Sequence, residues 1–204
     1  MKKIIFAVVM VATSLSLVAF TKKDKSNAGV TFTVTAQKSK VDWVGSKKSD
    51  YHTGYFPVKS GSVQVDGGKL VGGSFVIDVA GLKVTDERGG EKLQGHLSSG
   101  DFFDIAKFGE ATFTITKVDY IKADRATIKG DLSLKGIKAP VTFTAIIRNA
   151  DDKGFFAEAF FPFDRTVFGI KAHLLYKGKC YRRSLGYASY LKNLWKIYFL
   201  SSDS

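Results

Sequence analysis

Three polar side chains in the middle of the sequence could bind a metal ion or transfer protons. His96, Asp101 and Asp104 lie close together in the chain, and imidazole and carboxylate groups are common ligands of zinc and other transition metals. The predicted end of a short helix separates His96 from Asp101, and no second histidine follows at ligand spacing. The sequence therefore predicts no metal site, and the two carboxylates are expected to fix the loop by accepting backbone N–H bonds.

The other candidates for chemistry are isolated. His52 and His96 are interpreted as polar residues at the mouth of a binding site, although His52 and His173 are equally consistent with ordinary surface histidines. Asp164 and Arg165 are expected to pair at the surface, where an ion pair contributes about 0–1 kcal/mol and indicates no function. No serine occupies a G-x-S-x-G elbow, and no glycine-rich loop joins a strand to a helix. Neither catalytic residues nor a cofactor are predicted.

Most of the chain alternates between apolar and polar residues, which is typical of strands with one buried face. Residues 31–36 and 40–45 are predicted to form a first hairpin. Gly67-Gly68 and Gly72-Gly73 are predicted hairpin turns, since glycine adopts positive φ without a steric penalty. Further strands are predicted at residues 52–58, 62–66, 74–79, 111–118, 126–134, 141–148 and 155–163. This pattern predicts an all-β fold, either a sandwich or an antiparallel barrel, with one short helical insertion.

The helical insertion is predicted at residues 91–99. Leu93 and Leu97 lie four positions apart there, the spacing of one face of a short helix. The next segment, Asp101-Phe102-Phe103-Asp104, places two large rings between two carboxylates, which a solvated loop would not favour. The two rings are therefore expected to cover one opening of the fold as a lid.

The volume of the inward-facing side chains favours an eight-stranded barrel over a sandwich. Such a barrel has an interior just wide enough to be filled by side chains or to hold one slender ligand, and the pattern alone is consistent with both. Asp78 and Glu158 are candidate inward carboxylates, and nothing pairs them for acid–base work. The main inward-facing residues and the two lid rings are Trp43, Phe56, Phe75, Ile77, Phe102, Phe103, Phe113, Ile115, Leu132, Leu134, Phe143 and Phe161.

Composition and charge limit the class of partner. The chain has 204 residues, of which 45% are apolar, enough to bury a sizeable core in one domain. The net charge is +12, but residues 1–28 carry +4 and residues 171–204 carry +6, which leaves +2 for the body. A nucleic-acid groove needs clustered charge on the folded surface, so no nucleic-acid partner is predicted. The single cysteine, Cys180, excludes an internal disulfide.

Residues 1–28 are predicted to be a signal peptide with a polar spacer. Two lysines precede an apolar run at residues 4–20, which is typical of a secretory signal, and an uncleaved anchor is the alternative. The cleavage site stays open. We therefore expect an exported protein that is periplasmic or secreted.

Five segments of the body follow one another in a recognisable order. They are H-T-G-Y-F from His52, G-G-S-F-V-I-D-V from Gly72, G-H-L-S-S-G-D-F-F-D-I-A-K-F from Gly95, G-D-L-S-L-K-G-I-K-A-P-V-T-F from Gly130 and F-D-R-T-V-F-G-I from Phe163. Together they resemble the YceI-like family of bacterial, mostly exported lipid- or polyisoprenoid-binding proteins. The resemblance implies that residues 29–170 form a lipocalin-like barrel whose inward-facing residues line a long apolar tunnel, and it implies no catalytic residue.

The expected function is that of an exported binding protein that sequesters a long apolar amphiphile, such as a polyisoprenoid, an isoprenoid quinone or a fatty acyl chain. The alternative is a cell-envelope enzyme that acts on a lipid or quinone held in the same barrel, with His96 or His52 as its acid–base group. A ligand-free structural domain is a third class. Transient contact with a membrane is compatible with the first two, and the sequence leaves the ligand and the oligomeric state open.

Residues 171–204 depart from the family pattern. They contain five of the eight tyrosines and the only cysteine, with no linker before them. This abrupt change favours an out-of-frame end over a genuinely divergent one, and it predicts that the barrel lacks a closing strand. A short amphipathic helix is the other interpretation. The residues at helical spacing are Tyr187, Tyr190, Leu191, Leu194, Trp195 and Tyr198.

Overall fold

Strands dominate the structure, which is a computed structural model. It describes residues 29–34, 36, 39–47, 50–88, 90–151, 153–170 and 193–202, with the backbone alone at residues 46, 47, 50 and 193–202. The elements in chain order are β1 (Val30–Val34), β2 (Lys40–Lys47), β3 (Asp50–Asp66), β4 (Lys69–Asp78), β5 (Lys83–Val84), α1 (Gly90–Ser98), β6 (Glu110–Lys122), β7 (Arg125–Leu134), β8 (Ile137–Ala150), β9 (Gly154–Phe163), the 3-10 helix η1 (Arg165–Phe168) and β10 (Asn193–Ser202).

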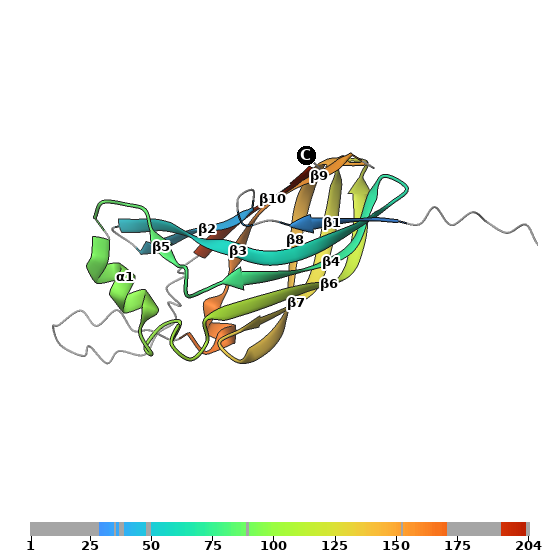
Figure 1. Cartoon of the computed structure of the whole chain (residues 1–204). Helices are drawn as coiled ribbons and strands as arrows, with labels where there is room; N and C mark the ends of the chain where they lie inside the picture. Colours follow the sequence, from blue (N-terminus) through green and yellow to red (C-terminus); the bar gives the residue numbers. More distant parts are fainter. Residues whose placement is uncertain are drawn as a thin grey trace, which may run out of the picture.

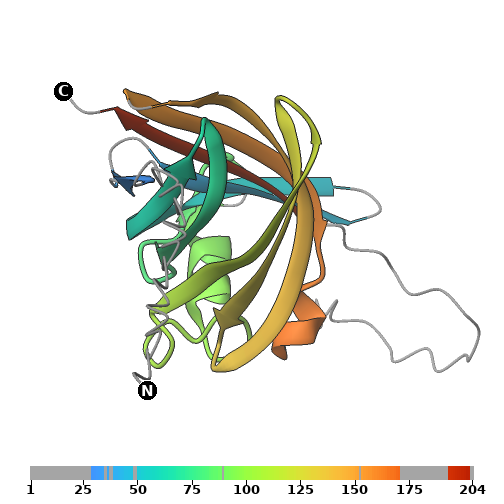
Figure 2. The same ribbon diagram turned by 90° about the vertical axis from the view of Figure 1, so that its right-hand side faces the viewer.

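Eight of the described strands pair side by side in a closed antiparallel ring. The order is β3, β2, β10, β9, β8, β7, β6 and β4, and β4 pairs again with β3. The curled sheet is visible from two directions (Figure 1, Figure 2). Strands β1 and β5 pair with β3 only. The predicted all-β, eight-stranded antiparallel barrel with one short helix is therefore confirmed.

Strand β3 is long enough to change partners along its length. Its first half pairs with β2, where Val41 lies opposite Phe56, and its second half pairs with β1, where Phe32 lies opposite Val63. Strands β1 and β2 thus follow each other along β3 and do not pair with one another. The predicted first hairpin is wrong for this reason, and the two strands predicted at 52–58 and 62–66 are one continuous strand.

The two glycine pairs have different roles. Gly67 and Gly68 form the two-residue turn between β3 and β4 with φ of 55° and 74°, as predicted. Gly72 and Gly73 lie inside β4, next to a register shift in its pairing with β3, so the second predicted turn is wrong. A glycine pair inside a strand often marks a bulge. The alternating pattern on either side of the pair is the same for a bulge and for a hairpin turn, so the sequence does not distinguish them.

Strand β10 closes the ring. It pairs with β9, where Trp195 lies opposite Phe161, and with β2, where Trp195 lies opposite Trp43. The expectation that the chain lacks a closing strand is therefore wrong. The alternative of a short helix is wrong for Leu194, Trp195 and Tyr198, which lie in β10, whereas Tyr187, Tyr190 and Leu191 lie outside the described residues. Residues 171–192 lie outside the described residues, and the out-of-frame origin of this end stays a prediction.

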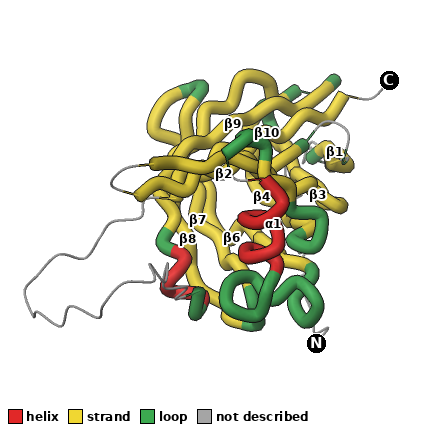
Figure 3. Tube along the Cα trace, turned by 90° about the vertical axis from the view of Figure 1, so that its left-hand side faces the viewer, coloured by secondary structure: helices red, strands yellow, loops and turns green. Residues whose placement is uncertain are grey.

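The apolar side chains of the ring meet in one core. Along β7 and β9 every second residue is buried, and the buried residues of all the ring strands whose side chains are described form one cluster. Helix α1 lies across one end of the barrel (Figure 3), next to β5 and to the half of β3 that pairs with β2. It begins and ends within one residue of the predicted bounds. The predicted lid segment follows it directly, so the barrel wall, α1 and this segment enclose the candidate site.

Candidate functional site

A row of four phenylalanines crosses the inner wall of the barrel. The ring centroids are 6.5 Å apart for Phe75 and Phe113, 5.7 Å for Phe113 and Phe143, and 4.4 Å for Phe143 and Phe161. Strand β7 lies between Phe113 on β6 and Phe143 on β8. The two rings meet because β7 has Gly130 there: a Cβ at this position would be 2.3 Å from Cζ of Phe113. The row therefore depends on one missing side chain.

Two more aromatic residues rest on glycines of a neighbouring strand. A Cβ on Gly54 would be 2.3 Å from Cζ2 of Trp43, its partner across β2 and β3. A Cβ on Gly61 would be 2.8 Å from Cδ1 of Phe75, its partner across β3 and β4. Aromatic rings that cover strand glycines are a known way to stabilise curved sheets.

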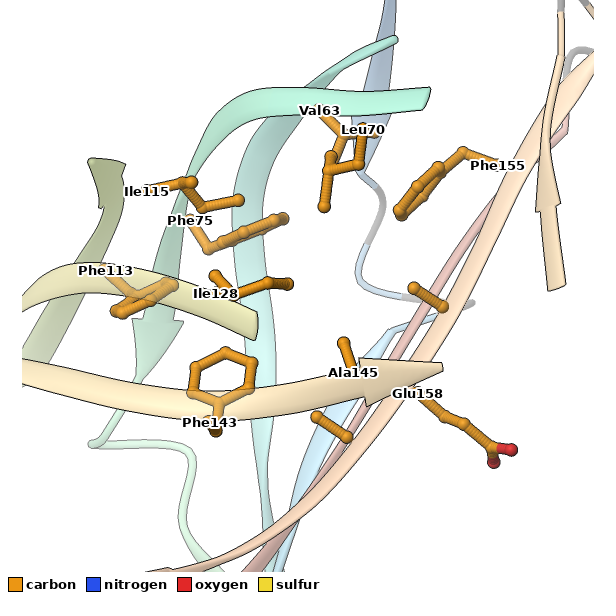
Figure 4. Close-up of a pocket in the computed structure, with 12 residues that line it drawn as sticks. Val63, Leu70, Phe75, Phe113, Ile115, Ile128, Phe143, Ala145, Phe155 and Glu158 are labelled. Atoms are coloured by element: carbon orange, nitrogen blue, oxygen red, sulfur yellow. The ribbon is translucent and has the colours of Figure 1, made fainter. Parts of the chain in front are cut away.

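The side chains drawn around the middle of the barrel are apolar except for Glu158 (Figure 4). The cavity among them measures about 10 Å³, at the lower limit of what one water molecule needs and far below the roughly 300–1,000 Å³ of ligand pockets. Its lining consists of Val63, Leu70, Phe75, Phe113, Ile115, Ile128, Phe143, Ala145, Phe155, Ala157, Glu158 and Ala159. This part of the barrel is therefore closed.

Glu158 is the one charged residue in that lining, and its carboxylate points away from the other labelled side chains (Figure 4). It accepts hydrogen bonds from the Arg148 guanidinium, one of them 3.0 Å from Nε. Asp78 accepts the Gly81 N–H at 2.9 Å and fixes the turn after β4. The prediction of inward carboxylates is therefore wrong for Glu158, and Asp78 has a local structural role.

The helix is attached to the barrel by one amide side chain. Gln94 of α1 accepts the Val84 N–H at 2.8 Å and donates to the Leu82 carbonyl, so it pairs with the open edge of β5 as a neighbouring strand would. Leu97, on the same helix, is buried. These contacts hold α1 over the barrel end.

The predicted lid segment closes the same end. Phe103 is 7% exposed, and its ring centroid lies 5.3 Å from Phe56 of the barrel wall and 4.8 Å from Phe102. Phe102 is half-buried and also meets His96 of α1 at 6.1 Å. Lys135, in the turn between β7 and β8, donates to the carbonyls of Gly100 and Phe102 at 3.1 and 2.5 Å. Phe103 therefore inserts into the barrel, and Phe102 joins it to the helix.

Asp104 fixes this segment through its backbone. Its φ is 52°, its N–H donates to Ser99 and its carbonyl accepts the Lys107 and Phe108 N–H groups. The carboxylates of Asp101 and Asp104 accept no backbone N–H among the described residues, so the loop-fixing role predicted for them is wrong. The sequence does not show whether an aspartate fixes a loop through its carboxylate or through its backbone, because aspartate is favoured both as a capping side chain and at positive φ.

Arg165 is buried against the lid segment and does not form the predicted surface pair. Its guanidinium lies 4.9 Å from the centre of the Phe102 ring, and it donates to the Ile170 carbonyl at 2.7 Å. Burial lowers the pKa of the Arg165 guanidinium, and the nearby Asp164 charge partly opposes this shift. Asp164 instead caps η1, where it accepts from the Thr166 N–H and hydroxyl at 2.9 and 2.6 Å. These hydrogen bonds hold the pKa of the Asp164 carboxyl below its usual value.

The two predicted mouth residues lie at the helix end of the barrel. Nδ1 of His52 is 3.0 Å from Oδ1 of Asp86, whose second oxygen accepts the Thr53 N–H at 3.0 Å. His96 lies in the last turn of α1, where its carbonyl accepts the Ser99 N–H and hydroxyl. Within the described ranges, no three histidine, cysteine, aspartate or glutamate side chains gather closely enough to hold a metal ion. The structure thus supports a polar rim here, and the ligand-binding role of both histidines stays a prediction.

The structure buries most of the predicted tunnel and lid residues, whose role in ligand binding stays a prediction. Phe102 and Ile115 are half-buried. The buried ones are Trp43, Phe56, Phe75, Ile77, Phe103, Phe113, Leu132, Leu134, Phe143 and Phe161.

The sequence analysis missed four polar residues that position the site: Asp86, Gln94, Lys135 and Arg165. Each contacts a residue in another structural element, 10 or more positions away in the chain, so local spacing carries no signal for the contact. For Arg165 one signal was present, since it follows a strongly apolar strand and precedes the apolar V-F pair of η1.

Comparison with known proteins gives consistent matches. Residues 24–184 match the model of the YceI-like domain. This match extends past residue 170, the last residue of the segments that carry the resemblance in the sequence. A UPF0312 protein of Pseudomonas fluorescens is 30% identical over 110 residues, covering 53% of this chain and 56% of that protein. The chain thus matches only about half the length of this relative.

Two solved structures share the fold at low sequence identity. Burkholderia cenocepacia BcnA has a TM-score of 0.65 at 19% identity, with 83% of this chain and 99% of BcnA covered. A polyisoprenoid binding domain from Saccharophagus degradans has a TM-score of 0.58 at 14% identity, with 84% and 98% covered. In the part of the chain that the structure describes, no helix is long and apolar enough to cross a membrane.

Proposed function

This chain belongs to the family of YceI-like domains, and on that premise we propose that it binds a long apolar amphiphile inside its barrel and shields it from water. The observation that carries the proposal is the phenylalanine row along the inner wall, continuous from β4 to β9. A polyisoprenoid, isoprenoid quinone or fatty acyl chain has few polar groups. Its affinity must come from apolar area removed from water, at roughly 25 cal/mol per Å² before the costs of association.

The closed interior adds a condition to the proposal. With a cavity of about 10 Å³, a chain enters only if side chains of the row rotate or move apart. The lid segment is the proposed route, because Phe103 closes the helix end and is held by edge contacts with Phe56 and Phe102. The name of the Saccharophagus degradans domain supports an isoprenoid ligand. The apolar run at residues 4–20 supports export, and we extend the proposal to a periplasmic or secreted protein in transient contact with a membrane.

Native mass spectrometry of protein purified from a bacterial host tests this function. We expect a bound mass that organic extraction removes, and we expect the extracted protein to bind a fluorescent long-chain fatty acid. Phe113→Asp should abolish binding, because it places an unpaired carboxylate in the row. Thr112→Asp is the matched control, since this neighbouring side chain is exposed on the outer face of the same strand. No extractable lipid together with no binding of the probe would refute the proposal.

The hydrogen bond between His52 and Asp86 is the observation that favours the rival function, an envelope enzyme. A carboxylate that orients an imidazole is a common arrangement in acid–base catalysis. The same extraction decides between the two. Chemical conversion of the bound lipid over time, lost in His52→Ala, would favour the enzyme, whereas recovery of unchanged lipid favours binding.

A further inference from the structure

One polar atom inside the barrel has no partner. Trp43 is 8% exposed, and its indole Nε1–H makes no hydrogen bond. Buried tryptophans usually find an acceptor for this group, since an unpaired buried donor is destabilising. Two other buried side-chain nitrogen or oxygen atoms in the described part of the chain also lack a partner, Ser39 Oγ and Arg125 Nε. Only Trp43 lies on the inner face of a ring strand, since Ser39 precedes β2 and Arg125 flanks a groove on the outer surface.

The register of β2 and β3 places this indole. Trp43 lies opposite Gly54, and the next inward pair toward the rim is Gly45 opposite His52. His52, Gly54 and Phe56 alternate along β3 and share its inner face. The indole covers Gly54, because a Cβ there would be 2.3 Å from Cζ2 and 2.5 Å from Cε2, the carbon bonded to Nε1. The unpaired N–H therefore belongs to the inner wall, diagonally next to the His52–Asp86 pair.

We infer that the Nε1–H of Trp43 is the hydrogen-bond donor for the polar end of the ligand. This inference rests on the proposed function and specifies its ligand: a long apolar chain that ends in a neutral oxygen acceptor, such as an ester, ketone or hydroxyl group. The donor carries no charge, and the Asp86 carboxylate, which accepts the Thr53 N–H next to Gly54, already contacts His52. A neutral acceptor can pair with this N–H without a counter-charge, whereas a carboxylate or phosphate buried beside it would need a cationic partner. A hydrocarbon end would leave the donor unpaired.

Three probes of equal chain length test the inference: methyl hexadecanoate, hexadecanoate and hexadecane, each added to lipid-free full-length protein. We expect the ratio of ester affinity to hydrocarbon affinity to fall by about 2- to 12-fold in Trp43→Phe, the range for one net hydrogen bond. Phe56→Leu is the control. It lies on the same inner face, so it should weaken both probes by the same factor and leave the ratio unchanged.

A second measurement on the unmodified protein does not depend on the folding of the variant. In ¹⁵N–¹H spectra the chain has two indole resonances, and the one of Trp43, identified by sequential resonance assignment of the unmodified protein, should move downfield with the ester and not with the hydrocarbon. An unchanged affinity ratio without an ester-specific shift overturns the inference and leaves the proposed function intact. Hexadecanoate that binds as tightly as the ester, with the same shift, overturns the choice of a neutral end group. No binding of any probe overturns the proposed function and the inference with it.

Discussion

Gly130→Ala should destabilise the barrel although it adds only one methyl group. The new Cβ would lie 2.3 Å from Cζ of Phe113 and 2.6 Å from the Thr114 carbonyl oxygen, whereas carbon atoms pack at about 3.5–4.0 Å. The Phe113 ring must therefore move by more than about 1 Å and lose its contact with Phe143. Overpacking of this kind costs about 1–3 kcal/mol, and the lost aromatic pair adds about 0.5–1.5 kcal/mol. The reduced freedom of the unfolded chain returns about 0.5–1 kcal/mol, so we expect a net loss of about 0.5–4 kcal/mol.

A double-mutant cycle in urea isolates the contribution of the ring. Phe113→Leu removes the atom that clashes, so in combination with Gly130→Ala it should recover at least about 0.5 kcal/mol of the expected sum of the two single losses. Gly95→Ala is the matched control: it lies in α1 with nothing within 4 Å of its Cβ, and it should be neutral or stabilising by up to about 1 kcal/mol. Strict additivity of Gly130→Ala and Phe113→Leu would show that Gly130 does not hold the row together.

Three further predictions concern the lid and its supports. Lys135→Met removes the donor to Gly100 and Phe102 and should speed release of a fluorescent fatty acid by about 2- to 12-fold in stopped flow, whereas Lys138→Met, on the exposed surface, should not. Arg165→Lys should lower the free energy of unfolding by about 1.5–3 kcal/mol, because lysine cannot reproduce the planar contact with the ring and the hydrogen bond together. The folded-state pKa of Asp164 is below the usual 3.8, so the ionised carboxylate stabilises the fold above pH 3.8, and this stabilisation is lost as the pH falls through the folded-state pKa. The melting temperature of Asp164→Asn should therefore depend less on pH between about pH 5 and about pH 2 than that of the parent.

Each of these has a contrary outcome. Equal release rates for the two lysine variants would mean that the segment is held by its own backbone. Full stability of Arg165→Lys would mean that charge alone matters at this position. A melting temperature of Asp164→Asn that falls with acid as steeply as that of the parent would assign the acid sensitivity to other carboxylates.

The sequence predicted the ring strands wherever one face is apolar and the other polar. Phe113 and Ile115 on β6 and the alternation along β7 and β9 were sufficient for this. Pairing was harder to predict, because any two alternating strands can pair. Both β1 and β2 pair with β3 because β3 is long enough for two partners in succession. The sequence predicts this length only if Gly61 is interpreted as part of the strand and not as its end.

Some features of the candidate site could likewise be predicted from the sequence, and others could not. Burial of the large aromatic residues followed from alternation, and the adjacent rings of the lid segment were evident because they lie outside it. The packing of Phe113 over Gly130 could not be predicted, since a glycine in a strand pattern signals a bulge, a bend or a close approach equally well. Gln94 and Lys135 are ordinary surface residue types, and only the three-dimensional fold shows which backbone groups they reach.

Closure of the ring by β10 has a consequence for how the protein is made. Leu194 lies opposite Val44 on one side and Pro162 on the other, so both strands that flank β10 are synthesised before the strand that joins them. Until then β2 and β9 each have an open edge, the kind of surface that recruits strands from other chains. Contacts between such distant parts of a chain also form slowly. The protein should therefore depend, during synthesis, on factors that cover exposed strand edges, and a nascent chain arrested before residue 193 should aggregate.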